Sequence, residues 1–132
     1  MRNHFAAGLL IIAIAAAPAA AQSRWKEIGK TSAGNVVSIA PKSVKTKNGI
    51  ITADLQVRFV TPVETPQGKW MLSRHVAMFD CAKKAIAAKS TTYYGDVAAT
   101  KVIEKKVTAQ PGFGPALGGS MAQVALDYVC KK

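Results

Sequence analysis

Apolar and polar residues alternate strictly over residues 51–59. Successive side chains of a β-strand point to opposite faces, so this segment is predicted to be a strand with one buried face and one hydrated face. The Asn48-Gly49 pair just before it is a turn signal. The residues on the predicted buried face are Ile51, Ala53, Leu55, Val57 and Phe59.

Five other segments are predicted to be strands, at residues 25–28, 35–40, 70–79, 85–94 and 101–107. Residues 85–94 contain enough Ala and Lys for a helix, but the Ser90-Thr-Thr-Tyr-Tyr94 end favours a strand. The side chains expected on one face of segment 70–79 are Trp70, Leu72, Val76 and Met78.

Pro and Gly residues mark the connections between these strands. Residues 41–44, which begin with Pro41, are predicted to form a turn or a single helical turn. Residues 61–69 contain Pro62, Pro66 and Gly68 and are predicted to form a hairpin loop of some length. Residues 110–119 are rich in Gly and Pro and are predicted to form an irregular linker.

Residues 120–130 are predicted to form the one helix. Ser120 is a plausible N-cap, and Gln123 three residues later completes a capping box. One polar stripe carries Gln123, Asp127 and Lys131, and the predicted apolar face carries Met121, Val124, Ala125, Tyr128 and Val129. The predicted fold class is therefore α+β, a small antiparallel sheet of about six strands with one C-terminal helix.

The first 21 residues have the pattern of a cleaved secretory signal peptide. Arg2 and His4 lie in a short polar start, residues 5–17 form an uncharged apolar run, and Ala19-Ala-Ala21 supplies the small residues of a cleavage site. The apolar run is shorter than the roughly 20 residues that a spanning helix needs. We expect a mature domain at residues 22–132, with no membrane span and no cysteine for a lipid anchor at the cleavage site.

The chain is strongly basic, with 18 Lys and Arg residues against 7 Asp and Glu. Cleavage removes only Arg2, so 17 basic and 7 acidic residues would remain, a net charge of +10 on 111 residues. For an exported protein this charge favours anionic lipids, acidic polysaccharides or cell-wall polymers rather than nucleic acid. A soluble, well-hydrated surface explains it equally well. The candidate binding residues are Lys42, Lys45, Lys47, Lys83, Lys84, Lys105 and Lys106.

Cys81 and Cys130 are the only cysteines, and an exported chain with two cysteines is predicted to form one disulfide. The bond would fix the end of the helix to the strand that ends near Cys81. A metal pair or a catalytic thiol is the alternative. Either would need more partners than His75, the single histidine of the mature chain.

Catalytic and cofactor motifs are absent from the sequence, and no metal or cofactor is expected. His75 lies on a predicted strand without a recognisable catalytic partner. The large aromatic residues fit core packing at least as well as ligand stacking; they include Trp25, Trp70, Tyr93 and Tyr94.

A series of short motifs follows one order along nearly the whole mature chain. It comprises Trp25-Lys-Glu-Ile28-Gly29, Pro41-Lys-Ser-Val44, Gly49, Thr65-Pro-Gln-Gly68-Lys69, Phe79-Asp80-Cys81, Thr92-Tyr93-Tyr94-Gly95 and Tyr128-Val129-Cys130. In this order the chain resembles the surface-adhesin protein E family. The resemblance implies the same fold of sheet, C-terminal helix and disulfide. It also implies a non-enzymatic protein, because the founding members are surface lipoproteins that bind host matrix and plasma proteins.

The lack of a lipid-anchor cysteine separates this sequence from those founding members. The predicted function is an exported, adhesin-like binding module, periplasmic or secreted, for an extracellular or envelope protein or an acidic polymer. Two alternatives remain: a small secreted enzyme with an unrecognised site, and a structural accessory of the cell envelope.

Overall fold

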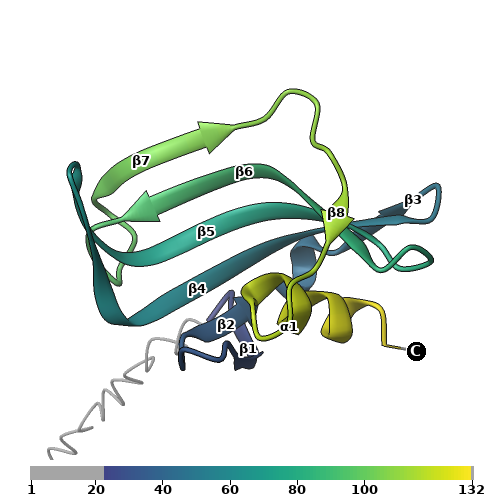
Figure 1. The fold of residues 1–132 in the computed structure, drawn as a ribbon, viewed down its shortest axis with the longest axis horizontal. Coiled ribbons are helices and arrows are strands. Elements are labelled where there is room, and N and C mark those ends of the chain that lie inside the picture. The colour runs from purple at the N-terminus through teal and green to yellow at the C-terminus, as the bar shows by residue number, and fades with distance from the viewer. Residues whose placement is uncertain (1–22, 132) are drawn as a thin grey trace, which may run out of the picture.

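The computed structural model describes residues 23–131, so the predicted signal peptide at 1–21 lies outside the described residues. It contains one antiparallel sheet and one C-terminal helix, which confirms the predicted α+β class (Figure 1). The elements are β1 (Lys26–Lys30), β2 (Val36–Ile39), the 3₁₀ turn η1 (Pro41–Ser43), β3 (Lys45–Lys47), β4 (Ile50–Thr65), β5 (Gly68–Asp80), β6 (Ala85–Tyr94), β7 (Val102–Val107), β8 (Gly114–Pro115) and α1 (Met121–Val129).

Six strands form the main path of the sheet, in the order β1-β2-β4-β5-β6-β7. The short strands β3 and β8 pair with β4 and β6. The sheet is curled, and α1 lies across one side of it, in contact with β1, β2, β4 and β6 (Figure 1). We call this side the inner face and the opposite side the outer face.

The hairpin of β4 and β5 corrects the predicted loop at residues 61–69. Strand β4 continues to Thr65, and β5 begins at Gly68, so only two residues lie outside the strands. Pro62 lacks a backbone N–H for a sheet ladder. It is tolerated because it lies in the irregularity of register between Arg58 and Val63.

The predicted turn at Asn48-Gly49 is confirmed, and it belongs to a second hairpin that the sequence did not reveal. Lys47 pairs with Ile50 across two residues whose φ angles are both positive, 52° and 77°. Two-residue loops of this kind match the twist of the flanking strands. Strand β3 was missed because its three residues are all exposed and carry no apolar alternation.

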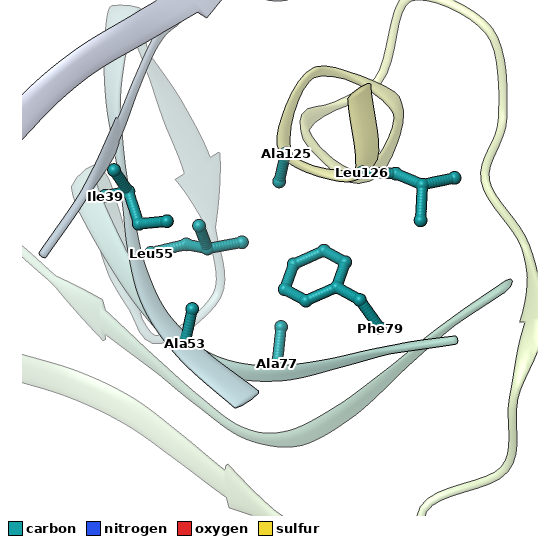
Figure 2. Close-up of a cluster of buried hydrophobic side chains, with 7 residues drawn as sticks. All are labelled: Ile39, Ala53, Leu55, Ala77, Phe79, Ala125 and Leu126. Carbon is teal, nitrogen blue, oxygen red and sulfur yellow. The ribbon is translucent and has the colours of Figure 1, made fainter. Parts of the chain in front are cut away.

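The hydrophobic core lies between the inner face and α1 (Figure 2). The alternation predicted for residues 51–59 is confirmed, because Ala53, Leu55 and Val57 are buried on this face. In Figure 2 the ring of Phe79 lies between the sheet and the helix. The buried cluster comprises Ile39, Ala53, Leu55, Ala77, Phe79, Ala125 and Leu126.

Leu72, Val76 and Met78 share one face of β5 as predicted, and the register against β4 decides which face is buried. Leu55 pairs with His75 and Ala53 with Ala77, so the inner face carries the odd-numbered residues of this part of β5. Val76 and Met78 therefore lie on the outer face. Both faces of the segment contain apolar residues, so alternation alone could not identify the buried one. Trp70 departs from the predicted set, because its ring stacks on Tyr93 of β6.

The helix begins as predicted and is rotated slightly from the predicted orientation. The Ser120 hydroxyl accepts a hydrogen bond from the backbone N–H of Gln123 (3.3 Å). The Gln123 side chain does not complete the capping box, because it donates to Asp127 Oδ1 instead (2.6 Å). The buried residues are Ala125 and Leu126, whereas Tyr128, predicted to be buried, remains 37% exposed.

Cys81 and Cys130 form the predicted disulfide, with their Cα atoms 5.4 Å apart. Cys81 opens the turn between β5 and β6, and Cys130 is the C-cap of α1. The bond therefore fixes the last turn of a nine-residue helix to the sheet. Helices this short are marginal in isolation, so α1 depends on such tertiary contacts.

We predict that the double substitution Cys81→Ser and Cys130→Ser lowers the free energy of unfolding by about 2–5 kcal/mol. Urea denaturation of the parent protein and of the variant measures this loss of stability. Hydrogen exchange of the variant should show that the backbone amides of α1 lose protection first. Reduction of the unsubstituted chain should reproduce the loss. Two titratable thiols in the unfolded, unreduced protein would contradict the account.

Candidate binding site

The predicted lysine clusters occupy two regions of the fold. Lys45 and Lys47 lie on β3, and Lys83 and Lys84 lie in the turn between β5 and β6. Lys47 pairs with Ile50, which pairs with Asp80, so the register brings these two clusters to the same end of the sheet (Figure 1).

The other candidate lysines have separate surroundings. Lys42 is exposed in η1. On β7, Lys106 lies 3.7 Å from a Glu104 carboxylate oxygen, whereas its neighbour Lys105 lies on the outer face. The seven lysines therefore do not form one site, and their role in binding stays a prediction.

Lys83 and Lys84 line a hollow of about 860 Å³ between the β5–β6 turn and α1. Lys131 and the carboxylate of Asp127 line it as well. Lys84 has a φ of 50°, and the backbone N–H of Lys83 donates to Asp80 Oδ1 (3.2 Å), so the turn has a defined conformation. The disulfide forms part of the wall and holds the turn against the helix.

A second cationic site lies in the middle of the outer face, and sequence reasoning missed it. It is a cleft of about 270 Å³. We call it the arginine cleft. Its lining includes Arg24, Trp25, Asp54, Arg74, Ser90, Thr92, Tyr94 and Lys105.

Sheet register builds the arginine cleft. In successive antiparallel strands, paired residues point to the same face, so a row of paired residues crosses the sheet. Arg74 of β5 pairs with Gln56 of β4 and Thr92 of β6, and Thr92 pairs with Lys105 of β7. These residues are far apart in the chain, and of them only Lys105 belongs to a basic pair in the sequence. The only sequence feature that could have indicated this site is that its residues occupy polar positions of alternating strands.

The inner face has its own pocket, of about 340 Å³, beyond the end covered by α1. Trp70 and Tyr93 stack within it, with ring centroids 3.7 Å apart. The buried indole N–H of Trp70 has no hydrogen-bond partner among the described residues. The pocket is mainly apolar, and Val57, Phe59, Val63 and Met121 contribute to its wall.

His75 lies at the polar side of this pocket. Its Nε2 atom is 2.8 Å from the Ser73 hydroxyl, and its Nδ1 atom is 3.1 Å from the Thr91 hydroxyl. Burial disfavours the charged imidazolium and lowers the pKa of His75 to about 4. The neutral ring is thus held between two hydroxyls and forms no ion pair with a carboxylate of residues 23–131.

Within the described part of the chain, no group of three or more His, Cys, Asp or Glu residues is arranged to hold a metal ion. No helix in residues 23–131 is long and apolar enough to cross a membrane.

Comparison with known proteins identifies one family. The family model for surface-adhesin protein E matches residues 25–131. No curated protein matches the sequence. Among solved structures, crystal form II of Haemophilus influenzae protein E has a TM-score of 0.57 at 14% identity, and the match covers 83% of this chain and 88% of that one. Protein E from non-typeable Haemophilus influenzae has a TM-score of 0.54 at 14% identity, with 86% and 79% covered. At this identity the structural likeness shows a shared fold.

We predict that His75 makes stability depend on pH between about 6.5 and 4. Its pKa in the folded chain, about 4, lies below the ordinary histidine value of 6.5, so in this window the unfolded chain binds a proton that the folded chain does not. The free energy of unfolding should be unaffected above pH 6.5. It should fall on acidification by up to about 1.4 kcal/mol per pH unit.

The variant His75→Gln isolates this effect, because it keeps a polar side chain beside both hydroxyls and leaves every carboxylate in place. Urea denaturation at several pH values should show a weaker pH dependence for the variant than for the parent chain. Identical pH profiles for the two chains would contradict the assignment.

Proposed function

We propose that this chain, which belongs to the surface-adhesin protein E family, is an exported, non-enzymatic binding protein for an acidic polymer or for an extracellular or envelope protein. Membership of this family supports an adhesin-like binding role for the chain. The match over residues 25–131 is the observation that carries the proposal, because it spans almost all of the described fold.

The charge of the chain supports an acidic partner. Its formal charge is +11, and a net positive surface raises the local concentration of anionic partners and steers their approach. Three salt bridges form among the described residues, so most of the basic side chains there are not in such pairs. These are the properties of a surface suited to binding polyanions.

Two features support export. Residues 1–21 have the sequence of a secretory signal peptide. Disulfides persist in oxidising compartments such as the periplasm or the extracellular medium, and the bond between Cys81 and Cys130 fixes α1 to the sheet. We therefore propose that the functional protein is residues 22–132, in the periplasm or outside the cell.

We predict that the exported protein begins near Gln22, because Ala19 and Ala21 provide the small residues that signal peptidase requires. N-terminal sequencing and intact mass measurement of the exported protein test this. The substitution Ala21→Leu should block cleavage, whereas Ala16→Leu should permit it. A mature protein that retains residues 5–17 would contradict the proposal and favour a tethered form.

We predict that binding to acidic polymers weakens steeply with salt, since charge interactions at the surface are screened over about 8 Å at physiological ionic strength. Retention on immobilised heparin measures it. Reversal of Lys105 and Lys106 should weaken retention more than reversal of Lys45 and Lys47, although each removes the same charge, because Lys105 lies on the outer face and lines the arginine cleft.

Equal weakening by the two reversals, which remove the same charge, would mean that net charge alone retains the protein. Retention that does not depend on salt would contradict the polyanion part of the proposal. Thermal unfolding of both variants should match the parent chain, because all four lysine side chains are exposed.

A further inference from the structure

We infer that the arginine cleft binds a carboxylate or sulfate group of an acidic polysaccharide, with Arg74 as the residue that contacts the anion. This inference rests on the proposed function and gives it a site and a ligand class. The proposed site differs from the site predicted from the lysine clusters, because most of those lysines lie at the end of the sheet or in separate surroundings.

The guanidinium of Arg74 is held in place before any ligand arrives. Its central carbon lies 5.1 Å from the centroid of the Trp25 ring and 5.5 Å from that of Tyr94. Its Nε atom donates a hydrogen bond to Gln56 Oε1 (3.0 Å). A fixed guanidinium loses little side-chain entropy on binding an anion, and its planar fork matches the geometry of a carboxylate or sulfate.

The charge of Arg74 has no counter-ion among the described residues. The carboxylate of the cleft, Asp54, is instead bound by Arg24, whose Nη2 atom lies 2.7 Å from Asp54 Oδ2. Lys105 adds a further positive charge two strands from Arg74, a spacing of roughly 10 Å. The cleft therefore has an excess of positive charge centred on an arginine whose Nη atoms form no ion pair in residues 23–131.

The rest of the lining favours a polysaccharide over an acidic peptide. Peptides commonly bind to sheets by adding a strand to an exposed edge. The arginine cleft lies over β4, β5 and β6 in mid-sheet, where backbone groups are paired in the ladders. It offers side-chain hydroxyls from Ser90 and Thr92. A chain rich in hydroxyl groups that also carries anions can use both kinds of contact.

The test is the affinity of the mature protein for a heparin-derived hexasaccharide, measured by titration calorimetry at 150 mM salt. Arg74→Gln should weaken binding about tenfold or more, as expected for loss of hydrogen bonds to a charged group. Lys47→Gln removes the same charge from the end of the sheet and should weaken binding less than twofold. Equal weakening by the two variants would overturn the inference and leave binding by net charge intact.

Fluorescence gives a second measurement that keeps Arg74 unchanged. The chain has two tryptophans, Trp25 in the arginine cleft and Trp70 on the inner face. In Trp70→Phe, the hexasaccharide should change the emission of Trp25, whereas in Trp25→Phe the emission of Trp70 should not respond. A response from Trp70 alone would place the ligand on the inner face and overturn the inference.

Poly-glutamate of matched charge serves as the peptide probe. The inference requires poly-glutamate to bind more weakly than the hexasaccharide. Tighter binding of poly-glutamate that depends on Arg74 would overturn the inference. It would mean that the cleft binds an acidic protein, and the proposed binding function would still hold. If the parent chain binds neither probe, the polyanion part of the proposed function fails together with the inference.

Discussion

The contact between one short helix and one end of a curled sheet organises this protein. Leu126 and Ala125 of α1 cover Phe79 on the inner face, and the disulfide to Cys130 prevents the last helical turn from separating. Burial of a large apolar side chain contributes about 1.5–3 kcal/mol, so a few such residues supply much of a small domain's stability. The inner face is therefore buried in the core, except for the apolar pocket beside Trp70.

The outer side of β4 is polar because of the same alternation. Each apolar residue that β4 places against the helix is followed by a polar one on the other side, and antiparallel register aligns these polar residues with those of β5 and β6. Arg74 is thus brought within about 5.5 Å of two aromatic rings that are distant in sequence. The fold converts scattered basic residues into one cleft with an arginine in a fixed position.

The sequence was sufficient for the features that depend on local patterns. Alternation identified the buried residues of β4, Asn48-Gly49 marked a turn, and two cysteines were enough to predict the disulfide. Features set by pairing between strands were not accessible. The buried face of β5 is decided by its register against β4, because both its faces are apolar. The arginine cleft is invisible for the same reason, since a sequence does not tell which residues of β4, β5, β6 and β7 lie in one row.

The central claim is that α1 closes the inner face and leaves the outer face to bind an acidic ligand. NMR chemical-shift mapping of the labelled mature chain, titrated with an acidic hexasaccharide, tests it directly. The account predicts the largest shifts at Arg74, Thr92 and Lys105, with little change in α1. Shifts confined to β3 and the turn after Cys81, or to the pocket beside Trp70, would contradict it.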